Sequence, residues 1–221
     1  MDKHIKVDLH MHTRFSPDSL MAPSELVRRC ELVGLNCIAV TDHNTILGAM
    51  ETRKIAPFRV IIGEEIRTSE GEVIGLFLDE QIPPGLSPKE TANRIHSQGG
   101  LLAIPHPFDK FRRSVITKKG LLELRNHANL LEVFNARNTF QSSNQNALTL
   151  AREWGMLNSA VSDAHTTIEL GRTYMEMPDF DGTATGFIES VSQAQLVMRP
   201  ITPLIHAITT LTKIWKRIAI T

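Results

Sequence analysis

Short apolar strands alternate with helices along the chain, and strand after strand ends in histidine, aspartate or glutamate. In parallel α/β folds the carboxyl ends of the strands line one crevice, where ligands and catalytic groups gather. The pattern therefore predicts an α/β fold with one polar site assembled from distant parts of the sequence. The endings are His10/His12, Asp42/His43, Glu65, His106 and Asp163/His165.

The first of these endings has the spacing that a pair of metal ligands needs. His10 and His12 are two residues apart on an extended segment, so both imidazoles can face one point. Asp18 follows in a Ser-Pro-Asp-Ser turn that can fold back over the strand end. Zinc, manganese and iron accept such mixed imidazole and carboxylate ligands. One His-x-His pair often serves only packing, but five polar endings in register are hard to explain without metal.

Composition narrows the class of protein. The 221 residues are enough to bury one barrel core, and we expect residues 1–221 to form a single domain. Zero formal net charge gives no global reason to expect nucleic acid or membrane partners. Cys30 and Cys37 lack the metal-binding Cys-x-x-Cys spacing and are typical of small buried side chains. Without a signal-peptide pattern or a membrane-length apolar run, a cytoplasmic protein is expected.

Hydrophobic periodicity and capping residues predict the elements between the motifs. Helices are expected from Pro23 to Val33, from Asn44 or Thr45 through Arg53, from Ser87 to Gln98, and from Asn144 to Trp154. A hairpin is expected from Ile66 to Leu78. Strands are expected at 37–41, 58–62, 101–104, 130–134, 158–161 and 172–177.

The tail at 201–218 has apolar residues at helical spacing and basic residues elsewhere. A basic amphipathic helix can lie on a membrane. We favour a helix that packs on the barrel and covers an open side of the domain. The apolar positions are Ile201, Leu204, Ile205, Ile208, Leu211, Ile214, Trp215 and Ile218.

Five motifs together resemble the polymerase-and-histidinol-phosphatase (PHP) superfamily, over Lys6 to Glu176. The resemblance implies a distorted (β/α)7 barrel with a divalent metal cluster at the C-terminal ends of the strands. It also implies phosphoester hydrolysis, by a small stand-alone enzyme rather than a polymerase-fused domain. The motifs are His10-Met11-His12, Thr41-Asp42-His43, Gly63-Glu64-Glu65, Pro105-His106-Pro107 and Ser162-Asp163-Ala164-His165.

Carried over by position, the resemblance implies three groups of ligands for zinc, manganese or iron. Glu65 is preferred to Glu64 because the family's ligand glutamate precedes an apolar residue. Asn135 stands where many three-metal members have a histidine, so two ions are expected and a third is open. His10, His12, Glu65 and Asp163 would hold the first ion, Asp18, His43 and His165 the second, and His106 with bridging Glu65 the third.

Phosphoester hydrolysis needs an in-line nucleophile and neutralisation of phosphoryl charge, which paired divalent ions supply. Asp163 and His165 would orient the water, and Asp42 is a candidate for protonating the leaving group. Arginine pairs bidentately with phosphate. Arg137, Arg172 and Arg112, the last in a loop at 108–113, are therefore candidates for binding a second anionic group of the substrate.

The expected substrate is a small phosphomonoester, such as a nucleotide bisphosphate or a sugar or amino-alcohol phosphate. The sequence has no broad basic stripe, so long nucleic acid and membranes are not expected as partners. Three alternatives stay open. They are an exonuclease or phosphodiesterase acting on short oligonucleotides, a metal-dependent amide or lactone hydrolase, and a non-catalytic metal-binding barrel.

Overall fold

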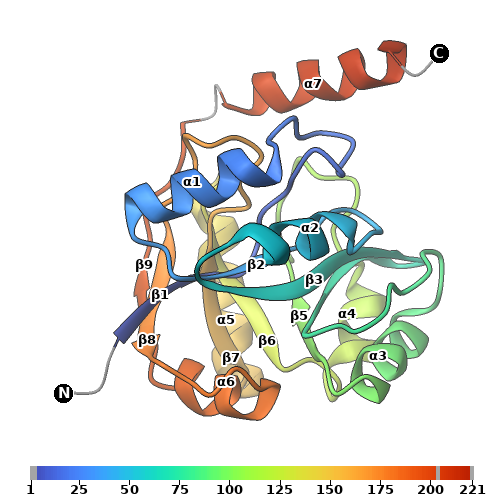
Figure 1. Cartoon of the computed structure of the whole chain (residues 1–221). Helices are drawn as coiled ribbons and strands as arrows, with labels where there is room; N and C mark the ends of the chain where they lie inside the picture. Colours follow the sequence, from blue (N-terminus) through green and yellow to red (C-terminus); the bar gives the residue numbers. More distant parts are fainter. Residues whose placement is uncertain (1–3, 203–204, 220–221) are drawn as a thin grey trace.

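The computed structural model describes residues 4–202 and 205–219, and its sheet curls into a nearly closed barrel surrounded by helices (Figure 1). The strand order is β7-β6-β5-β4-β3-β2-β1-β8-β9. Six strands are parallel: β1 (His4–Asp8), β2 (Cys37–Val40), β3 (Arg59–Thr68), β5 (Leu101–Ile104), β6 (Leu130–Asn135) and β7 (Leu157–Val161). β4 (Gly71–Leu76), β8 (Tyr174–Pro178) and β9 (Gln195–Val197) pair antiparallel with their neighbours.

The barrel closes just beyond the carboxyl ends of β1 and β7. Met11 forms a parallel bridge with Ala164, and the His12 N–H donates to the Ala164 carbonyl at 2.8 Å. This closure brings the first and last sequence motifs side by side. The predicted distorted α/β barrel is confirmed, although β8 and β9 give the sheet more strands than the expected seven.

Helices cover the outside of the sheet. α1 begins at Pro23 and ends before Gly34, whose φ of 75° suits a glycine, as the sequence predicts. At α3 the side chain of Ser87 accepts the Glu90 N–H, which caps the helix. The sequence did not indicate α4, α6 or β9, which are too short to give a clear period. The helices are α1 (Pro23–Val33), α2 (Leu47–Ile55), α3 (Pro88–Ser97), α4 (Lys118–Leu124), α5 (Gln141–Trp154), α6 (Ala184–Val191) and α7 (Ile205–Ala219).

The predicted end of the third strand is wrong. The apolar run at 58–62 indicated a strand that stops before Glu64, but β3 continues to Thr68 and pairs antiparallel with β4. Pairing with β4 carries the strand through Glu64 and Glu65, whose buried side chains both have polar partners. Oε2 of Glu64 accepts the Ile82 N–H at 2.9 Å, and Glu65 faces the opposite side. Glu65 therefore lies within a strand rather than at its end.

α7 lies beyond α1 in Figure 1 and contacts the loop after β1 through a polar side chain. Nζ of Lys216 donates to the carbonyls of Arg14 and Ser16 at 2.7 and 2.5 Å. The predicted apolar packing holds at Ile205 but is wrong at three positions, because Leu211, Trp215 and Ile218 are 66%, 59% and 70% exposed. Leu204 lies outside the described residues, as do the side chains of Ile208 and Ile214. Among the described helices none is long and apolar enough to cross a bilayer.

The hairpin of β3 and β4 gives a test of the fold. Gly71 has φ of 123°, and a Cβ there would lie 2.4 Å from the Ile116 Cα. Gly34 also has positive φ, but its Cβ would meet nothing within 4 Å. We expect Gly71→Ala to lower the free energy of unfolding by about 3 kcal/mol or more, because backbone strain and a backbone clash combine. Gly34→Ala, the control, should cost only about 1 kcal/mol. Urea unfolding followed by circular dichroism measures both, and equal losses would contradict the packing at Ile116.

Candidate metal centre

Four buried side chains converge at the carboxyl ends of β1 and β7 and on β3. Nε2 of His10 lies 3.0 Å from Nε2 of His12. Oδ1 of Asp163 lies 3.5 and 3.4 Å from these two nitrogens, and Oε2 of Glu65 lies 3.6 and 3.5 Å from them. Four ligands about 2.1 Å from a tetrahedral ion are separated by about 3.4 Å. These five separations are those of ligands around one ion, and His10, His12 and Asp163 form the compact part of the first predicted group.

Hydrogen bonds fix the protonation of two of the imidazoles. Nδ1 of His10 lies 2.7 Å from Oε1 of Glu132, and Nδ1 of His165 lies 2.8 Å from the Asp163 carbonyl. Both partners are acceptors, so each Nδ1 carries a proton and Nε2 is the nitrogen left to bind a metal ion. A metal-binding histidine is usually oriented in this way, by a hydrogen bond from the ring nitrogen that does not bind the metal.

Asp42 fixes the third imidazole. Its carboxylate accepts the Thr13 N–H at 2.7 Å, the Thr13 hydroxyl at 2.6 Å and the Ser16 hydroxyl at 2.6 Å. Because Ser16 gives its one hydroxyl proton to Asp42, its oxygen must accept the proton of His12 Nδ1 at 3.1 Å. Asp42 is thus a positioning residue. The expected role in protonating the leaving group finds no support in this placement, because Asp42 does not line the cavity described below.

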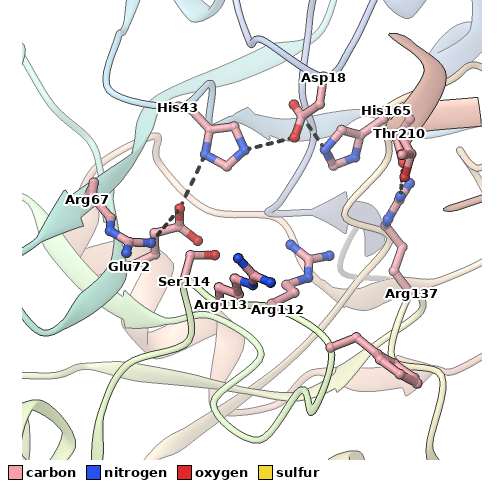
Figure 2. A pocket seen from close by; sticks show the side chains of 12 residues that line it. Asp18, His43, Arg67, Glu72, Arg112, Arg113, Ser114, Arg137, His165 and Thr210 are labelled. Carbon is pink, nitrogen blue, oxygen red and sulfur yellow. Dashed lines mark hydrogen bonds and ion pairs between the residues drawn. The ribbon is translucent and has the colours of Figure 1, made fainter. Parts of the chain in front are cut away.

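Figure 2 shows the second predicted group, in which Asp18 lies between His43 and His165. Nε2 of His43 and Nε2 of His165 each lie 3.4 Å from an oxygen of Asp18. Nδ1 of His43 lies 3.0 Å from Oε2 of Glu65, which therefore stands between the two groups. Sequence reasoning missed Glu72, whose Oε1 lies 3.8 Å from the same nitrogen. Only the alternation of the predicted hairpin could have suggested it, since the β3–β4 pairing places it there.

The remaining predicted ligand, His106, contacts Glu65. Nε2 of His106 lies 3.0 Å from Oε1 of Glu65, on the oxygen that the first two groups do not use. Two of the candidate ligands also have positive φ, 28° at His106 and 54° at Asp163. Backbone strain of this kind is retained where the surroundings impose it, commonly at functional sites.

Electrostatics fit the site to cations. Burial raises the pKa of Glu65 and Asp163, but imidazoles facing Glu65, and Arg112 with imidazoles facing Asp163, hold both pKa values well below the ordinary range. Burial also lowers the pKa of His165 to about 3, so its imidazole is neutral at neutral pH. The pKa of His10 is lowered by burial, yet surrounding carboxylates raise it well above the ordinary value. The buried carboxylates therefore favour positively charged partners in this cluster.

Two buried oxygens complete the test for metal. Within the described residues, Oε2 of Glu65 and Oδ1 of Asp163 accept no hydrogen bond. Leaving an ionised carboxylate oxygen buried without a donor is costly. Both oxygens point at the imidazole nitrogens named above, as carboxylate ligands of a divalent ion would. The donor set of these groups therefore fits divalent metal ions.

A cavity of about 510 Å³ opens beside the second group (Figure 2). Arg67, Arg112, Arg113 and Arg137 line it, together with Thr209 and Thr210 of α7. The cavity wall is therefore suited to an anionic ligand.

Two of the arginines predicted to bind substrate are placed differently from each other. Arg137 lines the cavity but is buried, and it donates to Oε1 of Glu169 at 2.5 Å and to the Thr209 hydroxyl at 2.9 Å. Arg172 is exposed and is not among the described residues that line the cavity. Of the predicted set, Arg112 and Arg137 are therefore near the ligand groups.

The chain belongs to the PHP domain family, whose model matches residues 8–176. It is 42% identical over 145 residues to the uncharacterized protein MJ1587 of Methanocaldococcus jannaschii, covering 60% of this chain and 82% of that protein. A Bacteroides vulgatus structure described as containing a predicted PHP-like metal-dependent phosphoesterase matches with a TM-score of 0.70 and 20% identity, over 90% of this chain and 66% of that one. The lesion-specific endonuclease PfuEndoQ of Pyrococcus furiosus matches with a TM-score of 0.67 and 15% identity, over 91% and 60%. At these identities the two structures show a shared fold.

The histidine assignments can be tested by metal content. We expect His43→Ala to lose about one equivalent of bound divalent ion, because its imidazole contacts both Asp18 and Glu65. His96→Ala is the matched control, since His96 binds the carbonyls of Gly100 and His127 at the far end of α3. Elemental analysis after reloading with manganese measures the content. Equal losses in the two variants would refute the division into ligand and structural histidines.

The role of Asp42 and Ser16 behind His12 can be tested separately. Ser16→Ala removes the acceptor that fixes the His12 proton on Nδ1. We expect metal affinity to fall by about 10-fold, as for other residues that orient a ligand. Ser97→Ala is the control, because that exposed hydroxyl only donates to the Arg94 carbonyl. Titration with manganese followed by calorimetry gives both affinities. An unchanged affinity in Ser16→Ala would contradict the role of Ser16 in orienting His12.

Proposed function

We propose that the protein hydrolyses a small phosphomonoester that carries a second anionic group, such as a nucleotide bisphosphate. The family and the ligand groups support metal-dependent phosphoester hydrolysis. The observation that carries the narrower proposal is the cavity of about 510 Å³, with its four arginines beside the second ligand group. Small-molecule sites commonly measure about 300–1,000 Å³.

The ligand groups position the reaction. Bound divalent ions would activate the attacking water and neutralise phosphoryl charge. Asp163 and His165 would orient the water, since Arg112 and Asn135 hold the Asp163 carboxylate and the Asp163 carbonyl holds the His165 imidazole. With Asp42 behind His12, protonation of the leaving group falls to solvent entering from the cavity.

The rim arginines recognise the second anion. Arg67 is about half exposed and lies 3.8 Å from Oε1 of Glu72, while Arg113 is exposed at the cavity wall. A second phosphate bound there would add binding energy that places the first phosphate over the ligand groups. Arg137 supports the wall instead, because its guanidinium is engaged with Glu169 and Thr209.

Cleavage of a short oligonucleotide is the second candidate. PfuEndoQ, an endonuclease, shares the fold, so the expectation that long nucleic acid is excluded gains no support from the comparisons. The same arginines could hold the phosphates of a strand end. We favour the small substrate because α7 contributes Thr209 and Thr210 to the cavity wall and so limits the room for a polymer.

A substrate panel separates these functions. With manganese added, we expect kcat/KM to be highest for a nucleoside 3′,5′-bisphosphate and at least 10-fold lower for a single-stranded oligonucleotide, because the cavity wall limits the room for a polymer. Steady-state rates on these two compounds, p-nitrophenyl phosphate and an amide provide the measurement. Preference for the oligonucleotide would move the function to a nuclease, and turnover of the amide alone would contradict phosphoester hydrolysis.

The second-anion site has its own test. Arg113→Ala should raise KM for the bisphosphate by about 10-fold, since one charged contact to phosphate is lost. The KM for p-nitrophenyl phosphate should change little, because that compound has no second anion. Arg172→Ala is the control, as its side chain lies off the cavity. If Arg113→Ala affected both substrates equally, the arginine would not read the second anion.

A further inference from the structure

We propose that Arg112 is a permanent cation in the third position of the ligand cluster, so that the protein works with two divalent ions and one guanidinium. The third group of candidate ligands comprises His10, Glu65 and His106. Nη1 of Arg112 lies 3.2 Å from Nε2 of His106, and Nη2 donates to Oδ2 of Asp163. The guanidinium thus lies against the nitrogen through which His106 would bind an ion.

The carboxylate of Asp163 is divided between two tasks. Oδ1 faces Nε2 of His10 and of His12 and accepts no hydrogen bond within the described residues. Oδ2 accepts N–H groups from Arg112 and, at 3.1 Å, from Asn135. Because the first ion position uses Oδ1, no oxygen of Asp163 is left to reach a third ion.

Asn135 cannot complete the third position either. Its Nδ2 donates to Oε2 of Glu132 at 3.0 Å and to Asp163, which uses both amide hydrogens. Its oxygen accepts the Arg137 N–H at 3.0 Å. Turning the amide to present its oxygen to an ion would break all three bonds, so Asn135 holds carboxylates in place.

The loop after β5 builds Arg112 into this position. Nε of Arg112 donates to Oδ2 of Asp109 at 3.2 Å. Asp109 is itself held, because its other oxygen accepts the Phe111 N–H at 2.9 Å and its N–H donates to the His106 carbonyl at 3.1 Å. The Arg112 side chain is only 19% exposed. Its charge is therefore fixed beside the ligands rather than mobile at the rim.

The arrangement gives Arg112 a role in the proposed reaction, on which this part of the inference rests. A guanidinium has five N–H groups, and three are directed at Asp109, His106 and Asp163. The other two can donate to a phosphoryl oxygen, because Arg112 lines the cavity. With one charge it stabilises the phosphoryl group but does not activate water, which leaves that task to the first two positions.

Counting bound ions tests the inference without substrate. The wild-type protein, reloaded with excess manganese and passed through a desalting column, should hold two ions per chain by elemental analysis. Arg112→Met keeps much of the side-chain length but removes the charge, so its count should rise from two to three. Arg112→Lys, which retains a cation, should stay at two. Arg113→Ala is the matched control for the loop and should also hold two.

Three ions in the wild-type protein, or two in a folded Arg112→Met variant, would overturn the inference. If circular dichroism shows that Arg112→Met does not fold, the wild-type and Arg112→Lys counts decide it. A kinetic readout addresses the catalytic role: kcat of Arg112→Met on p-nitrophenyl phosphate should fall by about 100-fold, as when one charge-stabilising donor is removed. A wild-type protein that binds two ions but hydrolyses no phosphoester would contradict the proposed function. The position of Arg112 would then be tested by the ion counts alone.

Discussion

Buried negative charge that must be balanced is the constraint on which the site depends. Glu65, Glu132 and Asp163 are all almost fully buried within one cluster. Ionised carboxylates in such surroundings are tolerated only when cations or donors neutralise them. Imidazoles, one guanidinium and candidate divalent ions provide that balance, and the unbonded oxygens of Glu65 and Asp163 mark where ions would bind. The arginines at the cavity wall add positive charge on the open side of the same cluster.

Hydrogen bonds behind the ligands make the cluster rigid. Each of the three Nδ1 protons, on His10, His12 and His165, has a defined acceptor, so each Nε2 is directed inward before any ion binds. Gly48 shows how close this support is, because a Cβ there would lie 1.9 Å from Oδ2 of Asp42. A ligand set positioned in advance costs less conformational entropy when it binds metal.

The barrel also decides which charged side chains line the cavity. Its closure between Met11 and Ala164 joins the first and last motifs, and the loop with Arg112 and Arg113 follows β5 into the same cavity. α7 contributes Thr209 and Thr210 to this cavity and the Lys216 contact to the loop after β1, while its Leu211, Trp215 and Ile218 are exposed. Segments outside the ligand motifs therefore build most of the cavity wall.

The sequence by itself determined the fold class and predicted the candidate ligands. Motifs such as His10-Met11-His12 are local, and apolar strands ending in polar residues place their endings at one edge, so periodicity and spacing are enough to find them. The tertiary structure alone decided which further residues contact these ligands and which line the cavity. It extended β3 through Glu65, brought Glu72 to His43, turned Asp42 away from the cavity, kept Arg172 off it and placed Arg112 against His106. These outcomes depend on antiparallel pairing and barrel closure between residues far apart in the chain, which no local pattern records.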